Sequence, residues 1–247
     1  MLAPVVLAAA VLIWELIVRI ADYPTFLLPA PRRVALRFLA VLREGTLLTH
    51  TLVTLSEVLG GLALGLSVAV ILGYLLAKSR TLEQILSPYI VASQAVPIVA
   101  LAPLLVIWFG AGTLSKVLVC ALTLFFPVLI NTIVGIRSVD RELNELMQSL
   151  NASRWQVFRY LELPASLPVL FGGLKVGVTL SVIGAVVGEF VGADRGLGFL
   201  VNLARGLFDT PLMFVALFTL MAIALTLYLL VSTLERWLLR WRWPEEI

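Results

Sequence analysis

The stretch Gly135–Pro164, GIRSVDRELNELMQSLNASRWQVFRYLELP, contains a polar island, from Arg137 onward, in an otherwise apolar chain. In the whole sequence 61% of the residues are hydrophobic and only 13% are charged, and the mean hydropathy is +1.05. This composition excludes a soluble domain and is typical of a polytopic helical membrane protein. A long charged segment on one side of such a protein predicts a surface that holds another molecule.

The apolar residues around the island form runs long enough to cross a membrane, which takes roughly 20 residues of helix. Six such runs are present, at about residues 3–20, 51–77, 85–109, 116–136, 166–191 and 211–234. The sequence therefore predicts an all-α fold with six transmembrane helices and one domain over residues 1–247. Pro88, Pro97 and Pro103 predict that the third span is bent or broken.

The distribution of lysine and arginine indicates the orientation. With a cytoplasmic N-terminus, the basic residues of the inner segments are Lys78, Arg80, Arg137, Arg141, Arg154, Arg159, Arg236, Arg240 and Arg242. Most outer ones, Arg19, Arg32, Arg33, Arg37 and Arg43, belong to a segment whose apolar spacing predicts an amphipathic helix along the membrane surface. Only Lys116, Arg195 and Arg205 then remain outside, so we expect both termini and the island in the cytoplasm.

The first half of the island has the pattern of a short amphipathic helix. Asp140 is a helix-capping residue, and Leu143, Leu146, Met147 and Leu150 recur at i, i+3, i+4 and i+7. An apolar stripe on a cytoplasmic helix predicts a docking surface for another protein. The alternative is a solvated connector, but connectors in helical proteins usually have about 2–8 residues.

The second half of the island predicts a turn followed by another helix. Asn151 stands where a helix ends in a left-handed residue, a conformation that asparagine tolerates well. Ser153 and Gln156 have the spacing of a capping box, and this helix is expected to last until Pro164 introduces the next span.

The spacing within the island resembles the EAA loop of ABC importer permeases. That loop has Glu-Ala-Ala, three residues, Gly, nine residues and Ile-x-Leu-Pro. Here Glu145-Leu146-Met147, three residues, Asn151, nine residues and Leu161–Pro164 follow the same register. The chain departs from the pattern in the bulkier Leu146-Met147 pair and in Asn151, which preserves the left-handed turn that glycine would supply.

The resemblance extends over nearly the whole chain. The stretches QAVPIVALAPLLVIWFGAGTLSK (94–116), FFPVLINTIVGIRSVD (125–140) and GAVVGEFVGADRGLGFLV (184–201) are similar to the nitrate, sulfonate, taurine and pyrimidine-precursor branch of these permeases. The resemblance implies a type I permease fold in the cytoplasmic membrane that pairs with itself. It also implies two cytoplasmic ATPase subunits, an extracytoplasmic solute-binding protein, and a coupling role for residues 138–164, with Leu143, Glu145, Leu146, Met147, Leu150 and Asn151 facing the ATPase.

The chain itself has no catalytic signature. No GxxxxGK[ST] phosphate loop, GxSxG elbow or HExxH site occurs in it, so ATP must be hydrolysed on a separate subunit. The single cysteine, Cys120, and the single histidine, His50, provide neither a disulfide framework nor a metal-ligand cluster. We therefore expect a protein that is not an enzyme, with no cofactor, no metal and no nucleic-acid partner.

Three ionisable residues inside the spans, Glu57, Lys175 and Glu189, are the candidates for the translocation pathway. Such groups cost roughly 2.5–3.5 kcal/mol near a helix centre, so they usually face a cavity or a partner. The alternative is an interhelical hydrogen bond or an extended side chain that reaches the membrane surface. The fifth span also carries small residues that allow close helix packing, namely Gly172, Gly173, Gly177, Gly184 and Gly188. We therefore expect the central passage beside that helix.

The transported solute is indicated only weakly. The stretch SVIGAVVGEFVGADRGLGFL (181–200) resembles permeases for vitamin-type heteroaromatics, such as riboflavin or a thiamine pyrimidine precursor. Two acidic residues inside the spans would also oppose an anionic solute. The alternative is a nitrate, sulfonate or taurine importer. A secondary transporter without an ATPase is a more remote alternative, because it leaves the apolar stripe of the island unexplained.

Overall fold

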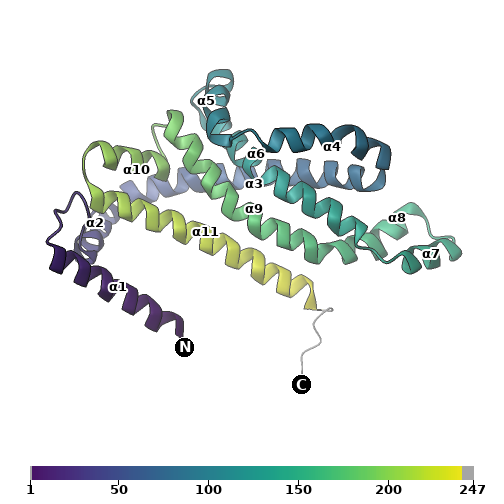
Figure 1. Cartoon of the computed structure of the whole chain (residues 1–247), viewed down its shortest axis with the longest axis horizontal. Coiled ribbons are helices and arrows are strands. Elements are labelled where there is room, and N and C mark those ends of the chain that lie inside the picture. Colours follow the sequence, from purple (N-terminus) through teal and green to yellow (C-terminus); the bar gives the residue numbers. More distant parts are fainter. Residues whose placement is uncertain (1, 241–247) are drawn as a thin grey trace.

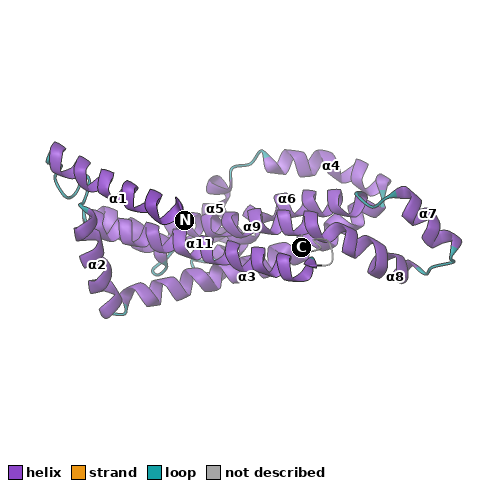
Figure 2. Ribbon diagram, turned by 90° about the horizontal axis from the view of Figure 1, so that it is seen from below, coloured by secondary structure: helices purple, strands orange, loops and turns teal. Residues whose placement is uncertain are grey.

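The computed structural model describes residues 2–240, and every regular element in that range is helical (Figures 1 and 2). The helices are α1 (Leu2–Ala21), α2 (Pro31–Arg43), α3 (Thr46–Lys78), α4 (Arg80–Gln94), α5 (Ile98–Phe109), α6 (Thr113–Arg137), α7 (Arg141–Ser149), α8 (Arg154–Val157), the π-helical turn η1 (Phe158–Glu162), α9 (Leu163–Gly192), α10 (Leu197–Gly206) and α11 (Thr210–Leu238). The all-α prediction is confirmed. Arg242, counted above among the inner basic residues, lies outside the described range.

Five helical segments between residues 2 and 240 are long and apolar enough to cross a membrane. They are Pro4–Ala21, Thr46–Lys78, Thr113–Arg137, Arg154–Gly192 and Thr210–Leu238. The pair α4 and α5, which meet at an angle of 96°, makes a sixth span if it is counted as one broken span. The predicted break of the third span is confirmed and lies at Pro97, whose backbone is extended. Pro88 and Pro103 lie within α4 and α5 and do not end them.

Helix α6 lies between α3 and α9 and touches both along its length (Figure 1). On the α3 side, a Cβ at Gly65 would lie 2.7 Å from the Ala121 carbonyl oxygen and 2.9 Å from the Ala121 Cα. On the α9 side, a Cβ at Gly184 would lie 2.9 Å from the Cα of the fully buried Cys120. The three helices therefore meet backbone to backbone, which only glycine permits at these positions.

The glycine face predicted for the fifth span is directed mainly at α6. A Cβ at Gly173 would lie 2.7 Å from the Asn131 Cβ, and one at Gly188 would lie 3.2 Å from the Lys116 Cγ. Gly172 is the exception, since a Cβ there would meet no atom within 4 Å. Most of this face is thus occupied within the chain itself.

The two ends of the molecule are built differently. Helix α7 lies at one end, where α3 and α6 finish and α9 begins, and α2 and α10 lie at the opposite end (Figure 1). Helix α2 runs across the long helices, as expected of a helix along a membrane surface (Figure 2). Its Val34 and Val41 are buried, and Arg37 forms an ion pair with Asp209 at 2.8 Å. We call these ends the α7 end and the α10 end.

We expect replacement of Gly65 by leucine to lower the thermal stability of the detergent-solubilised protein. The new side chain would overlap the α6 backbone, and overpacking of this kind costs about 1–3 kcal/mol or more. The matched control is Gly172→Ala, which fills open space within a helix and should leave the melting temperature unchanged or slightly raised. Equal melting temperatures for Gly65→Leu and the parent protein would show that α3 and α6 are not in close contact.

Candidate functional site

The 138–164 segment contains the turns and caps that its sequence predicts. The side chain of Asp140 accepts a hydrogen bond from the Glu142 amide at 2.9 Å, which caps α7. Asn151 has φ +52° and so forms the left-handed turn after α7. Ser153 and Gln156 form a reciprocal capping box, with hydrogen bonds of 2.7 and 3.3 Å. Local hydrogen bonding therefore shapes the segment.

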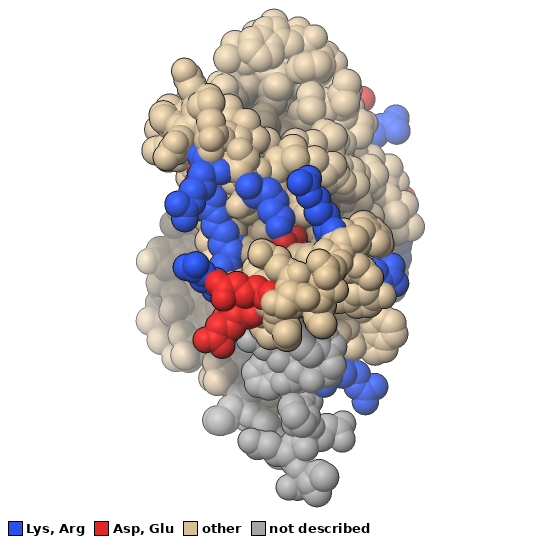
Figure 3. Space-filling model, turned by 90° about the vertical axis from the view of Figure 1, so that its right-hand side faces the viewer, with Lys and Arg blue, Asp and Glu red and all other residues tan. Residues whose placement is uncertain are grey.

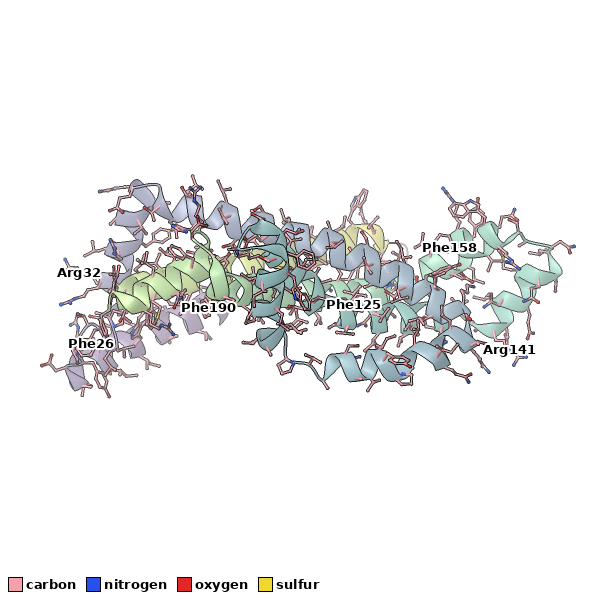
Figure 4. The ribbon with its side chains drawn as sticks, turned by 90° about the horizontal axis from the view of Figure 1, so that it is seen from above. Phe26, Arg32, Phe125, Arg141, Phe158 and Phe190 are labelled. Atoms are coloured by element: carbon pink, nitrogen blue, oxygen red, sulfur yellow. The ribbon has the colours of Figure 1, made fainter. Side chains whose placement is uncertain are left out.

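The apolar stripe of α7 is open to solvent. Leu143, Leu146 and Leu150 are 47%, 54% and 68% exposed, Met147 is half-buried, and no residue of α7 is buried. Glu145 is exposed and pairs with Arg141 of the same helix at 3.0 Å. The helix projects beyond the ends of the spans (Figures 1 and 4). An exposed apolar stripe on a projecting helix is a surface suited to a protein partner.

The second helix of the segment is not separate from the following span, contrary to the sequence prediction. Residues 154–192 form one continuous helix, in which the π-helical turn η1 joins α8 to α9. Proline inside an α-helix removes one hydrogen bond and clashes with the carbonyl four residues earlier. The wider π turn ends two residues before Pro164 and relieves that clash, so the helix continues through the proline.

Basic side chains gather around the α7 end. Figure 3 looks onto this end and shows more lysine and arginine than acidic side chains on the visible face. Lys78, Arg137 and Arg154 belong to this region, at the end of α3, the end of α6 and the start of α8. The excess of basic side chains agrees with a cytoplasmic position of the island, because lysine and arginine are enriched on the cytoplasmic side of membrane proteins.

A cluster of buried polar side chains lies at the α10 end, where α3 and α9 meet α10. Glu189 is 1% exposed; its Oε1 accepts a hydrogen bond from the Thr54 hydroxyl at 2.6 Å. Its Oε2 accepts from the amides of Gly198 and Phe199, the latter at 3.3 Å. The first amides of a helix have no partner within it, so Glu189 supplies what α10 lacks.

Two α3 side chains satisfy the neighbouring amides of α10. The Thr54 hydroxyl accepts from the Leu197 amide at 2.8 Å, and the His50 Nδ1 accepts from the Gly196 amide at 2.9 Å. Gly196 has φ +114°, and a Cβ there would overlap the Glu189 carboxylate. Gly196 and Gly198 therefore leave the room that the buried Glu189 carboxylate needs. Sequence reasoning did not detect this relation.

Glu57 and Lys116 complete this cluster. Glu57 is 2% exposed and lies beside Glu189, and its Oε2 is buried without a hydrogen-bond partner among the described residues. Lys116, counted above among the outer basic residues, is 2% exposed and is part of α6. Its ammonium donates to the carbonyl of Gly192 at 2.9 Å and to that of Ala111. Lys116 thus stabilises the carboxyl end of α9, where cations are favourable.

The structure brings together two of the three candidate pathway residues. Glu57 and Glu189 share the cluster just described, whereas Lys175 forms an ion pair with Glu235 of α11. Both side chains of that pair are about one-fifth exposed. Lys175 lies far from this cluster because roughly 21 Å of helix separates residues 175 and 189. Sequence reasoning had no partner for Lys175, because Glu235 is 60 residues away along the chain.

The structure thus defines a helical membrane protein that presents an exposed apolar stripe on a projecting helix at one end. The chain belongs to the family of binding-protein-dependent transport system inner membrane components, whose pattern matches residues 46–243. It is therefore an ABC importer permease of the inner membrane, a transport subunit and not an enzyme, whose partners include a binding protein and an ATPase. The resemblance read from the sequence is confirmed.

The chain is similar to two transport permeases over nearly its whole length. It is 57% identical to the riboflavin transport system permease protein RibX of Chloroflexus aurantiacus, over 96% of this chain and 89% of that protein. It is 38% identical to the formylaminopyrimidine transport permease protein ThiX of Halalkalibacterium halodurans, over 93% and 91%. A crystal structure of an amino acid ABC transporter with histidines has the same fold, with a TM-score of 0.60 at 21% identity, over 81% and 97%.

We expect Glu189→Ala to loosen the start of α10. The substitution leaves the amides of Gly198 and Phe199 buried without an acceptor, at a cost of about 1–3 kcal/mol for each. Hydrogen exchange at residues 197–199 should become roughly tenfold faster or more. The exposed Asp194→Asn is the control and should exchange like the parent. Unchanged exchange in Glu189→Ala would mean that the carboxylate does not hold α10.

Proposed function

We propose that this permease carries riboflavin, or a closely related heteroaromatic vitamin compound, into the cell. The observation that supports this most is the 57% identity to the riboflavin permease over 96% of the chain. The next relative, at 38%, is also named for a heteroaromatic solute, a formylaminopyrimidine. Nitrate, sulfonate and taurine remain the alternative solutes.

The working complex in this proposal has two copies of the permease and two ATPase subunits. Each ATPase binds the exposed stripe of one α7, formed by Leu143, Leu146, Met147 and Leu150. Glu145 contributes an exposed carboxylate, paired with Arg141, to the surface of α7. The left-handed turn at Asn151 sets the angle between α7 and α8. When the two ATPases close on ATP, they move the two α7 helices, and the spans pass from inward-facing to outward-facing.

The acidic pair acts in this proposal at the outer end of the path. Glu57 and Glu189 belong to the cluster that attaches α10, and α10 lies at the end opposite to α7 (Figure 1). A loaded binding protein would contact this end, where Asp194 and Arg195 are exposed. Lys175, paired with Glu235, links α9 to α11 beside the path. Opening of the path then requires movement of helices that the buried glutamates hold together.

The transport proposal is tested in proteoliposomes that contain the permease, its ATPase and its binding protein. We expect uptake of radiolabelled riboflavin that requires ATP and the binding protein, and that taurine in excess does not reduce. Uptake that an ion gradient drives without ATP would identify a secondary transporter. Uptake of taurine or a sulfonate, with none of riboflavin, would assign the chain to the anion alternative.

We expect Leu146→Asp to abolish docking of the ATPase while the permease still inserts into the membrane. A charge buried in an apolar contact costs several kcal/mol, and each 1.4 kcal/mol is a tenfold loss of affinity. Co-purified ATPase should therefore fall by roughly tenfold or more. The control Gln148→Asp adds the same charge on the other face of α7 and should retain the ATPase. Equal co-purification in both variants would mean that the stripe is not the docking surface.

A further inference from the structure

Glu162, the last residue of η1, is a buried carboxylate at the α7 end. Its side chain is 4% exposed, and it accepts hydrogen bonds from two side chains of α3. One is the ammonium of Lys78, at the last residue of α3, and the other is the hydroxyl of Tyr74, at 3.3 Å. The carboxylate therefore joins the π-helical turn to the end of α3.

Aromatic packing reinforces this connection. The Tyr74 and Phe158 rings meet edge to face, with centroids 5.3 Å apart and planes at 82°. The Lys78 ammonium lies 5.8 Å from the centre of the Tyr74 ring, within range of a cation–π interaction. We call these four residues, Glu162, Lys78, Tyr74 and Phe158, the α3 clamp. Two of them come from η1 and two from α3, so the clamp fastens one element to the other.

Apart from the α3 clamp, few contacts could transmit a displacement of α7 to α3. No residue of α7 is buried, and its side-chain hydrogen bonds stay within the helix or its cap. A displacement of α7 therefore passes along the backbone to the end of α6 on one side, and into α8 and η1 on the other. Among the described residues, the hydrogen bonds of Glu162 are the only ones that join α8 or η1 to α3.

The first of these two routes is independent of Glu162. Arg137, at the end of α6, donates to the Leu76 carbonyl of α3 at 3.3 Å and pairs with Glu83 of α4. Force that arrives through α6 therefore reaches α3 without the clamp. Force that arrives through α8 reaches α9 directly, because those helices are continuous, and the clamp is its hydrogen-bonded link to α3 at this end.

We infer that Glu162 is a positioning residue that makes α3 move together with the 138–164 segment when the ATPase displaces α7. This inference rests on the proposed docking of the ATPase at α7. The π turn supports it, because such turns inside α-helices are often found at functional sites. Without the carboxylate, α3 follows α8 and α9 less closely, because only its packing on α6 and the Tyr74–Phe158 contact remain at this end. ATP would then be hydrolysed without the matched movement of the two helices that transport requires.

The test compares transport with ATP hydrolysis in the reconstituted complex. Glu162→Ala should assemble with the ATPase and hydrolyse ATP close to the parent rate, while solute moved per ATP falls by about tenfold or more. The fold should survive, since Lys78 is 45% exposed and can turn to solvent. Lys78→Ala should lower the ratio in the same direction, and the exchange Glu162→Lys with Lys78→Glu should recover part of it. A purely structural role would instead lower transport and hydrolysis together.

The matched control is Glu15→Gln, which removes the ion pair with Arg19 within α1, away from α7, and should leave the ratio unchanged. A parent-like ratio in Glu162→Ala or in Lys78→Ala would overturn the inference. If Glu162→Ala fails to assemble, Lys78→Ala still decides, because it breaks the same contact from the α3 side. If the parent complex shows no ATP-dependent uptake, the proposed function itself is contradicted. A parent-like ratio in Glu162→Ala contradicts only the inference about Glu162.

Discussion

The close approach of α6 to α3 and to α9 is the contact on which the rest of the structure depends. In a membrane, apolar surfaces gain little by leaving lipid, so helices associate through close packing and a few polar contacts. Gly65 brings α3 onto the α6 backbone, and Gly184 brings α9 onto it near Cys120. The three helices therefore form one packed layer, and side chains at its two ends are held in fixed positions relative to each other.

Each end of that layer is fastened by one buried glutamate of the long helix that includes α9. At the α10 end Glu189 accepts from Thr54 of α3, and at the α7 end Glu162 accepts from Tyr74 of α3. Twenty residues of helix separate Thr54 from Tyr74, about 30 Å at 1.5 Å per residue. Buried carboxylates are costly unless they are hydrogen-bonded, so these contacts favour one arrangement of the two helices. When the permease changes shape, these contacts must either break or move together with the helices that they join.

Features that depend on neighbouring residues could be predicted from the sequence. The cap at Asp140, the turn at Asn151 and the capping box at Ser153 were found where their residue types indicate, and the third span breaks at one of its three prolines, Pro97. These features use hydrogen bonds or steric limits within a few residues. Contacts between distant residues could not be predicted in this way. The burial of Lys116, the pairing of Lys175 with Glu235 and the continuity of the helix through Pro164 all depend on which helices are adjacent.

The sequence by itself determined that this chain is a helical membrane protein with an amphipathic helix in its polar island, because hydropathy and helical periodicity are properties of the chain alone. It also carried the spacing that identifies the family of permeases. Only the tertiary structure decided that Glu57 and Glu189 lie together, and that Glu162 is attached to α3. The reason is physical: a buried charge needs a partner, and helix packing decides which residue, more than 80 positions away in the chain, provides it.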